Sequence, residues 1–571
     1  MNEVKKTFEN WLDNVTEVEL LQELKNIEEF PEEINERFYK DLKFGTAGLR
    51  GVMGVGTNMM NIYTVRKTSQ GLANYLKEQY DRPVVVVSYD SRKNSKIFAM
   101  ETAKVMAGNK IKSYITEKIQ PTPFLSFSVR EISANAGVMI TASHNPAEYN
   151  GYKCYGKDGA QMGEAEAQKI YEKMCEIDTF EDIKIMEFED AKACNLISFV
   201  SESIYESYFN CVMKQRINNN SLEGLKVVYT PLNGAGNYFV QKVLKVCGLK
   251  NLYVVSCQEQ PDENFTTCPY PNPESSDAYT CAKKLAISKN ADIILATDPD
   301  SDRVGICVKC DDDYTLLTGN EIGVLLCNYL LLQKSKSGTL PKNSMIVRSI
   351  VSTPMVDEIA SVYGCQVREV LTGFKNIASE ILKLELCNEE SRFIMGFEES
   401  NGYLVGTYAR DKDAVSAVLL LSEMALYYKN KGLTLLEVLN NLKQRYGFFA
   451  EKTLNFEFKG SLGRSRIENI MNNLRNFPFE YFKDRKILKV KDYLNSKIFD
   501  GLGNCVNEKN LPISNVLIFY FDEGAKLVIR PSGTEPKIKF YAMVKGNSLK
   551  NSELKINDLT TMVNNLIENV K

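Results

Sequence analysis

The chain has 571 residues, of which 44% are hydrophobic, and it carries a formal net charge of −3. At about 150 residues per domain, this length predicts roughly three or four domains with packed cores. The mildly acidic charge gives no bulk attraction to nucleic acid, so we expect no nucleic-acid partner. No apolar run approaches membrane-spanning length, so we expect no membrane association either. The N-terminus lacks the apolar core of a signal peptide, so we expect a cytoplasmic protein with 14 free thiols.

Short β-rich runs alternate with helical segments along most of the chain. Residues 4–29 have the periodicity of an amphipathic helix. Beyond them, apolar strands are followed by helices, which is typical of parallel α/β layers, and this unit repeats at least three times. The clearest strands are predicted at 83–90, 225–231, 251–256, 291–297 and 344–350. Polar stretches near 176–206 and 333–343 are typical of linkers, and alternating strands after them predict a C-terminal α+β domain.

One apolar strand ends in the run G-V-M-I-T-A-S-H-N-P, which leads into a loop of small residues. Pro146 restricts the backbone after Asn145, and such a loop presents a hydroxyl at the carboxyl edge of a sheet. On this loop alone, Ser143 has two interpretations: a turn or capping residue, or a reactive hydroxyl.

A second apolar strand leads into the run T-D-P-D-S-D-R. Asp298, Asp300 and Asp302 alternate there, and three carboxylates so close repel one another unless a cation offsets their charge. Oxygen ligands suit a hard ion such as Mg²⁺, which we favour over a solvated acidic turn. An EF-hand would need glycine in place of Arg303 and glutamate in place of Lys309, so that interpretation fails.

Three further loops carry polar groups whose function the residues alone leave open. R-P-S-G-T-E-P-K, at 530–537, offers many donors to a phosphate but is also compatible with a plain hairpin loop. G-F-E-E-S-N-G-Y, at 396–403, offers carboxylates to sugar hydroxyls or caps a helix. K-F-G-T-A-G-L-R-G surrounds Arg50 with glycines; it lacks the G-K-[ST] of a P-loop and is either a mobile linker or a functional loop.

His144 is the only histidine of the chain, which excludes a metal site built from several histidines. A Ser–His–acid triad would have to use it, yet its place next to Ser143 is awkward for a base that must face the hydroxyl. Cys307 and Cys310 form a lone C-x-x-C in an apolar strand, where positions three apart face opposite sides. This favours ordinary packing over a metal or redox site.

These loops occur in the same order and context as in the α-D-phosphohexomutase superfamily, which the chain resembles over nearly its whole length. Chance would rarely place T-A-S-H-N-P, D-P-D-S-D-R, G-F-E-E-S and R-P-S-G-T-E-P together in this order. The run F-G-T-A-G-L-R-G is similar to the branch that includes phosphoglucomutase-2 and phosphopentomutase. The resemblance implies three similar mixed-sheet α/β domains and a C-terminal α+β domain around a central cleft, with expected bounds 1–206, 207–333, 334–445 and 446–571.

The resemblance also implies roles for individual residues. Catalytic groups near the transferring phosphoryl group would be Ser143, His144, Lys153 and Arg50. The ligands of Mg²⁺ would be Ser143, Asp298, Asp300 and Asp302. Substrate would be bound by Arg303, Thr372, Gly373, Lys375, Glu398, Ser400, Arg410 and Lys412. Phosphate would be bound by Arg530, Ser532, Gly533, Thr534 and Lys537.

The implied activity is a mutase that interconverts the 1-phosphate and 6-phosphate of glucose or mannose. It would use a phosphoserine, a bisphosphate intermediate, Mg²⁺ and a sugar bisphosphate activator. The alternatives are a phosphopentomutase, a glucose-1,6-bisphosphate synthase, a metal phosphatase and a non-catalytic sugar-phosphate-binding protein. The expected partners are small sugar phosphates, the expected assembly is a monomer or homodimer, and the identity of the general base stays open.

Overall fold

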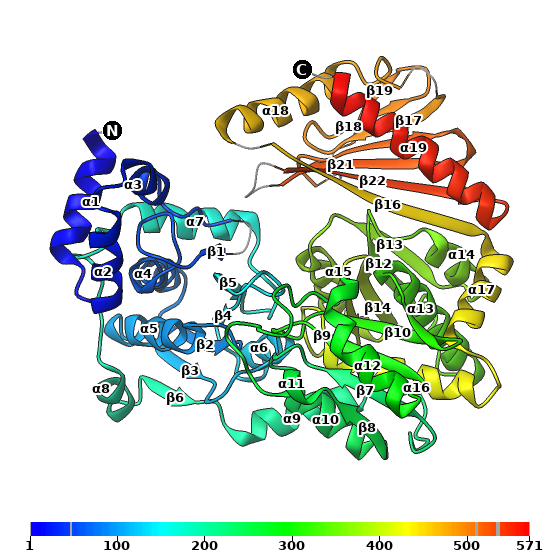
Figure 1. Ribbon diagram of the computed structural model, residues 1–571, viewed down its shortest axis with the longest axis horizontal. Helices are drawn as coiled ribbons and strands as arrows, with labels where there is room; N and C mark the ends of the chain where they lie inside the picture. Colours follow the sequence, from blue (N-terminus) through cyan, green and yellow to red (C-terminus); the bar gives the residue numbers. More distant parts are fainter. Residues whose placement is uncertain are drawn as a thin grey trace. The chain divides into compact units, whose positions relative to one another are not determined.

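The computed structural model describes residues 2–45, 48–458, 460–482, 485–508, 512–532 and 537–569. The chain divides into two compact units, Met1–Ser349 with Gly364–Leu436 and Ile350–Tyr363 with Glu437–Lys571 (Figure 1). The described residues form four sheets, three in the first unit and one in the second.

Three helices precede the first sheet: α1 (Asn2–Asn14), α2 (Val18–Ile27) and α3 (Pro31–Phe38). The single helix expected over residues 4–29 is therefore wrong, because the chain is extended at Glu17. A tertiary contact holds this break, since the backbone N–H of Thr16 donates to the Tyr63 hydroxyl at 2.9 Å. The ring of Trp11 packs edge-on against Phe38 and Tyr63, which anchors the helices to the first α/β layer.

The first sheet has the strand order β1-β5-β4-β2-β3-β6. Its central strands are parallel, whereas β5 pairs antiparallel with both β4 and β1. Its strands are β1 (Gly48–Val52), β2 (Val84–Tyr89), β3 (Lys112–Ile115), β4 (Ala136–Ile140), β5 (Tyr149–Gly156) and β6 (Ile197–Phe199). Its helices are α4 (Ile62–Gln79), α5 (Ser95–Gly108), α6 (Thr122–Glu131), α7 (Glu164–Cys175) and α8 (Phe188–Ala193). Because β2–α5–β3 and β3–α6–β4 cross in opposite directions, right-handed crossovers place α5 and α6 on opposite faces.

The second and third sheets repeat this plan. The second, in the order β11-β10-β9-β7-β8, comprises β7 (Lys226–Thr230), β8 (Asn251–Val254), β9 (Ile293–Thr297), β10 (Val304–Cys310) and β11 (Asp313–Leu316). Around it lie α9 (Glu202–Met213), α10 (Asn237–Val246), α11 (Ser256–Glu259), η1 (Ser276–Tyr279) and α12 (Thr280–Lys289). The third, in the order β13-β12-β14-β15, comprises β12 (Met345–Ser349), β13 (Gln366–Val370), β14 (Phe393–Glu398) and β15 (Gly402–Val405). Its helices in the first unit are α13 (Gly319–Lys336), α15 (Phe374–Leu386), η2 (Glu390–Arg392) and α16 (Ala414–Lys429).

In each of these three sheets the third strand of the repeat, β4, β9 or β14, lies between a parallel strand and the antiparallel strand that follows it. The turns after β4, β9 and β14 are the serine, aspartate and G-F-E-E-S loops of the sequence. The expected repetition of an α/β unit is thus confirmed, and it places three motif-bearing loops at equivalent positions of three sheets.

The second unit contains an antiparallel sheet in the order β16-β22-β21-β20-β17-β18-β19. The strands are β16 (Phe448–Glu457), β17 (Ile487–Asp492), β18 (Lys497–Asp500), β19 (Cys505–Asn507), β20 (Leu517–Phe521), β21 (Lys526–Pro531) and β22 (Lys537–Gly546). The remaining elements are α14 (Met355–Val362), α17 (Leu435–Tyr446), which begins at the border of the two units, α18 (Gly460–Asn476), η3 (Asp522–Gly524) and α19 (Leu549–Asn569). Apolar side chains of α18 and α19 share one core with β20, β21 and β22. The expected α+β domain is confirmed.

The stretch 176–206 was expected to be a linker, and this is wrong for residues 188–206. It contains α8, the start of α9 and β6, which pairs with β3 at the edge of the first sheet. Its polar composition reflects the exposure of an edge strand and of a short helix with one buried residue, Ala191. No helix in the described ranges is both long and apolar enough to cross a bilayer. All 14 cysteines are free thiols.

Candidate active site

Ser143 lies on the loop between β4 and β5 in a left-handed backbone conformation, with φ of 54°. This conformation costs a non-glycine residue about 1–2 kcal/mol, so the surrounding structure must hold it in place. The side chain is 3% exposed, and its Oγ donates to Oδ2 of Asp298 at 2.8 Å. Nδ1 of His144 lies 3.2 Å from the same Oγ. The loop therefore presents one hydroxyl to the aspartate loop and to the only imidazole of the chain.

Arg92 binds the backbone of the serine loop, and the sequence analysis did not identify this residue. The guanidinium donates to the carbonyl oxygens of Pro146 at 2.8 Å and Tyr149 at 3.1 Å, and closely to those of Ser143 and Asn145. Four carbonyl oxygens on one buried cation fix the course of the loop. The only sequence signal was Y-D-S-R, at 89–92, where the strand predicted at 83–90 ends.

Asp90 completes this support. Its Oδ2 lies 3.3 Å from Nε of Arg92 and accepts from the Thr141 hydroxyl at 2.6 Å, while its Oδ1 accepts from the Ser95 hydroxyl at 2.8 Å. Burial raises the pKa of the Asp90 carboxyl above its ordinary value, although the Arg92 charge opposes that rise. The pair is fully enclosed, so removing either partner would leave the other charge buried and uncompensated.

Asp298, Asp300 and Asp302 occupy the turn between β9 and β10, and one carboxylate oxygen from each lies within 4.8 Å of the others. All three are buried. Oδ1 of Asp298 accepts from the backbone N–H groups of Asp302 at 3.1 Å and Arg303 at 3.0 Å. Oδ1 of Asp300 and Oδ1 of Asp302 are buried and accept no hydrogen bond from the described residues. Buried carboxylate oxygens without donors fit a divalent cation.

Cationic side chains surround this cluster. Nζ of Lys153 lies 2.7 Å from Oδ2 of Asp300 and 3.6 Å from Oδ2 of Asp302, and Nζ of Lys412 lies 3.2 Å from the latter oxygen. Burial favours the neutral form of Asp300, but the Lys153 charge and the side-chain hydrogen bonds to Asp298, Lys153 and Thr122 together outweigh it and hold the pKa of Asp300 below its ordinary value. Burial raises the pKa of Asp298 well above its ordinary value, and the charges of Asp300 and Asp302 raise it further. The cluster thus carries repulsion that a bound cation would relieve.

His144 is held as the neutral imidazole. Burial lowers its pKa well below the ordinary value, and the positive charges of Arg303 and Arg50 lower it further. A neutral ring at physiological pH keeps one nitrogen free to accept a proton. This is compatible with a role beside the hydroxyl of Ser143.

Thr122, the first residue of α6, is a second residue that sequence reasoning missed. Its hydroxyl donates to Oδ2 of Asp300 at 2.8 Å, and its backbone N–H donates to the Asp300 carbonyl oxygen at 2.8 Å. The hydroxyl bond orients the carboxylate and the backbone bond holds its main chain, while Oδ1 accepts no hydrogen bond from the described residues. Outer groups of this kind commonly tune a metal site.

We expect Thr122→Val to weaken divalent-metal binding about tenfold, because Asp300 loses an orienting donor. Thr122→Ser keeps the hydroxyl and should bind metal like the wild type. Binding of Mn²⁺ measured by electron paramagnetic resonance reports this directly, without relying on turnover. Equal affinity in Thr122→Val and the wild type would contradict the orienting role.

The G-F-E-E-S loop is joined to the aspartate loop. Arg303 forms an antiparallel bridge with Gly402, and the backbone N–H of Val304 donates to the Asn401 carbonyl at 3.1 Å. At the end of β14, Oε1 of Glu398 accepts from the backbone N–H of Gly373 at 2.7 Å. The structure therefore brings this loop together with the turn at 372–373 and with the aspartates.

The other substrate-binding residues predicted in the third domain do not all face the aspartates. Ser400 and Thr372 flank Glu398 and Gly373 in these two loops, and Lys375 lies 3.7 Å from Glu164. Arg410 is buried, and its Nη2 donates to Oε2 of Glu385 at 2.7 Å, so this guanidinium is engaged away from the aspartates. Its expected role in substrate binding stays a prediction.

Glu399 is a further buried carboxyl that the sequence analysis did not single out. Burial raises its pKa to about 7, and the charge of Glu398 contributes to that rise. Its Oε2 accepts from the Ser349 hydroxyl at 3.0 Å. The group therefore titrates close to neutral pH beside the carboxylate that was assigned to sugar recognition.

Arg50 lies on β1, opposite Gly151 of β5, and its Nη1 is 3.4 Å from Oδ1 of Asn145. The structure thus places Arg50 beside the serine loop, and its catalytic role stays a prediction. Thr46 and Ala47, in the same glycine-rich run, lie outside the described residues.

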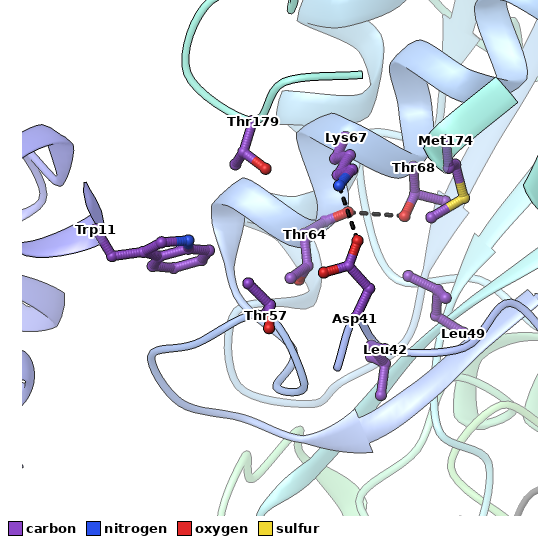
Figure 2. Close-up of a pocket in the computed structure, with 10 residues that line it drawn as sticks. All are labelled: Trp11, Asp41, Leu42, Leu49, Thr57, Thr64, Lys67, Thr68, Met174 and Thr179. Atoms are coloured by element: carbon purple, nitrogen blue, oxygen red, sulfur yellow. Dashed lines mark hydrogen bonds and ion pairs between the residues drawn. The ribbon is translucent and has the colours of Figure 1, made fainter. Parts of the chain in front are cut away.

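A cavity of about 20 Å³ lies beside the segment that carries Arg50 (Figure 2). Leu42, Leu49 and Trp11 line it together with Asp41 and Lys67, whose ion pair measures 2.8 Å. Such a volume holds roughly one water molecule, which excludes a sugar phosphate. The cavity is therefore a packing gap beside this segment and not a substrate-binding site.

The predicted phosphate-binding loop lies in the second unit, between β21 and β22. The backbone N–H of Ser532 donates to the Lys537 carbonyl at 2.7 Å, which closes the base of the loop, and Arg530 is on β21. Gly533 and Thr534 lie outside the described residues.

Comparison with known proteins agrees with this geometry. Three models of the phosphoglucomutase/phosphomannomutase family match this chain. The model of alpha/beta/alpha domain I matches residues 41–181, that of domain II matches 206–311, and that of domain III matches 318–446. The phosphoglucomutase of Staphylococcus epidermidis is 36% identical over 550 residues, which cover 96% of this chain and 98% of the relative.

Solved structures share the fold. A phosphomannomutase described as putative, from Thermus thermophilus, is 20% identical with a TM-score of 0.66, covering 91% of this chain and 99% of its own. The N-acetylphosphoglucosamine mutase of Aspergillus fumigatus is 13% identical with a TM-score of 0.50, covering 99% of both chains.

These similarities decide between the classes of function that the sequence left open. The match to phosphoglucomutase runs over nearly the full length of both chains and includes all of the motif-bearing loops of the first unit. A non-catalytic sugar-phosphate-binding protein is therefore set aside. The chain belongs to the phosphoglucomutase/phosphomannomutase family and is a sugar-phosphate mutase.

Proposed function

We propose that this mutase interconverts glucose 1-phosphate and glucose 6-phosphate, with the mannose phosphates as secondary substrates, through a phosphoserine at Ser143. The observation that carries the proposal is the 2.8 Å contact between Oγ of Ser143 and Asp298, one of three clustered buried aspartates. The preference for glucose is supported by the phosphoglucomutase relatives at 36% identity.

Mg²⁺ is the proposed metal, with Asp298, Asp300, Asp302 and a phosphoryl oxygen on Ser143 as ligands. The all-carboxylate set supports a hard cation, as do the two buried oxygens that accept no hydrogen bond within the described part of the chain. The structure of the Aspergillus fumigatus mutase is a complex with GlcNAc-6P and magnesium. When bound, the metal would neutralise charge on the phosphoryl oxygens.

The protein groups would then carry out a balanced exchange. The bond between phosphorus and Oγ of Ser143 breaks, and a bond to the free hydroxyl of the sugar phosphate forms. That hydroxyl loses its proton to a base, and the departing Oγ takes up a proton to restore the serine hydroxyl. His144 is neutral and is therefore a candidate for this base. Burial lowers the pKa of Lys153, but the charges of Asp300 and Asp302 raise it above its ordinary value, so Lys153 stays cationic. Arg50, Arg303 and the charge of Lys153 would stabilise the transition state.

The resulting bisphosphate would reorient and return its other phosphate to Ser143. Glu398 and Ser400, with Thr372, Gly373 and Lys375, would bind sugar hydroxyls, and Lys412 and Arg410 would add positive charge. One phosphate site would hold the non-reacting phosphate in both orientations, through Arg530, Ser532, Gly533, Thr534 and Lys537. A sugar bisphosphate would serve as activator by phosphorylating the free serine.

We also propose the four-domain division at 1–206, 207–333, 334–445 and 446–571. The enzyme would act in the cytoplasm, as a monomer or homodimer, on small sugar phosphates. The free state of its cysteines supports a reducing compartment.

Parallel assays of glucose 1-phosphate, mannose 1-phosphate and ribose 1-phosphate test the substrate, each with Mg²⁺ and glucose 1,6-bisphosphate. We expect the highest kcat/KM with glucose 1-phosphate. A clear preference for ribose 1-phosphate would establish the phosphopentomutase alternative, which the loop around Arg50 motivates. Release of inorganic phosphate as fast as isomer formation would instead favour a phosphatase.

A further inference from the structure

Residues 261–275, called here the cover segment, connect α11 to η1 without regular secondary structure. Long irregular connections are uncommon in compact domains and often functional. The segment is nevertheless well braced: backbone N–H groups of Asn264 and Thr266 donate to the Asp262 carboxylate at 3.0 Å and 2.8 Å. It belongs to the second α/β layer but contacts residues that support or form the catalytic centre, at three places along its length.

The first contact is made by Phe265, which is fully buried and has a left-handed φ of 46°. The guanidinium of Arg92 lies over its ring, 5.0 Å from the centroid. This is the same guanidinium that holds the carbonyl oxygens of the serine loop. The cover segment therefore contacts the guanidinium that fixes the course of the serine loop.

The second contact is made by Tyr270. Its ring meets the ring of His144 edge-on, with centroids 5.8 Å apart and an interplanar angle of 81°. Nδ2 of the buried Asn272 donates to the Tyr270 hydroxyl at 3.1 Å, and Oδ1 of Asn272 accepts from the backbone N–H of Glu274 at 3.0 Å. Asn272 thus fixes the Tyr270 ring, and that ring lies against the imidazole next to the Ser143 hydroxyl.

The third contact is the ion pair of Glu274 with Arg303, at 2.7 Å. Arg303 follows the last aspartate of the metal loop, and its backbone N–H donates to Oδ1 of Asp298. One short segment therefore contacts the support of the serine loop, the imidazole beside the serine and the end of the aspartate loop.

A phosphoserine mutase must transfer its phosphoryl group to a sugar hydroxyl while denying it to water. Ser143 is 3% exposed, and the Tyr270 ring lies edge-on against His144, whose Nδ1 is 3.2 Å from Oγ of Ser143. We propose that Tyr270 is a positioning residue that holds His144 against Ser143 and shields the phosphoserine from water. This inference rests on the proposed role of Ser143 as the phosphoryl carrier.

The full-length enzyme provides the test. Wild type, Tyr270→Ala and Tyr270→Phe are phosphorylated with glucose 1,6-bisphosphate, freed of sugar, and followed by intact-protein mass for loss of the phosphoryl group as inorganic phosphate. Tyr270→Ala should lose it at least about tenfold faster, because water gains the face that the ring covered. Tyr270→Phe keeps the ring but loses its hydrogen bond from Asn272, so its rate of loss should lie between those of the wild type and Tyr270→Ala. Tyr238→Ala, an exposed tyrosine of α10, is the matched control and should match the wild type.

Tyr270 is 45% exposed, so its truncation leaves no buried cavity and should leave the fold intact. Equal half-lives of the phosphorylated wild type and Tyr270→Ala would overturn the inference alone. Wild-type enzyme that takes up no phosphoryl group on Ser143 would overturn the proposed function, and this inference with it. If Tyr270 only supported the fold, Tyr270→Ala would lower kcat without changing the ratio of hydrolysis to transfer. That result would also contradict the proposed shielding.

Discussion

Ser143→Ala should lower kcat by about four orders of magnitude or more, because the group that accepts and donates the phosphoryl moiety is absent. The variant should also gain no phosphoryl mass from glucose 1,6-bisphosphate, whereas wild type should gain one group at this residue. A coupled assay of glucose 6-phosphate formation and intact-protein mass measure the two effects. Neither effect requires knowledge of which group is the general base.

The backbone of Ser143 allows a control that separates chemistry from folding. Its φ of 54° strains alanine as much as serine, so Ser143→Ala should change the melting temperature little. Ser143→Gly removes the same hydroxyl but relieves that strain, and should be at least as stable as wild type. Both variants should be equally inactive. Appreciable turnover in either would show that Ser143 is not the carrier.

The reactive groups were visible in the sequence because each lies in a short run after an apolar strand. T-A-S-H-N-P and D-P-D-S-D-R follow β4 and β9, and strand ends are where parallel sheets expose functional side chains. The repeated sheet order then explains why motifs far apart in the chain meet. Ser143 and Asp298, which share a 2.8 Å contact, are separated by 155 positions.

The supporting groups were not visible, because their roles exist only through tertiary contacts. Thr122 is 178 positions from the aspartate that it orients, and nothing in its own neighbourhood distinguishes it from an ordinary first residue of a helix. Arg92 acts through backbone carbonyl oxygens, which carry no signature in the sequence. For the same reason the break at Glu17 was missed: its cause is the hydroxyl of Tyr63, not the local pattern.

Asp300→Asn should weaken divalent-metal binding about 100-fold or more, because it replaces a charged ligand directly, whereas loss of an outer group costs roughly 10–100-fold. The same change removes the partner of Lys153, whose ammonium lies 2.7 Å from Oδ2 of Asp300. That uncompensated positive charge would oppose the cation further. Titration with Mn²⁺ followed by electron paramagnetic resonance, and the Mg²⁺ concentration for half-maximal rate, measure the effect.

The matched control for this charge change is Asp313→Asn, on the exposed strand β11 of the same sheet. Asp313 lies 3.9 Å from Lys283 with its side chain largely exposed, so its loss should leave metal affinity and rate unchanged. Wild-type metal affinity in Asp300→Asn would show that the two buried oxygens without donors serve another purpose. Loss of metal binding with Ser143 still phosphorylated would instead separate the metal from the uptake of the phosphoryl group. The Lys153 ammonium could by itself balance part of the negative charge of the aspartates. The pair of variants therefore tests whether the aspartate cluster also binds a metal ion.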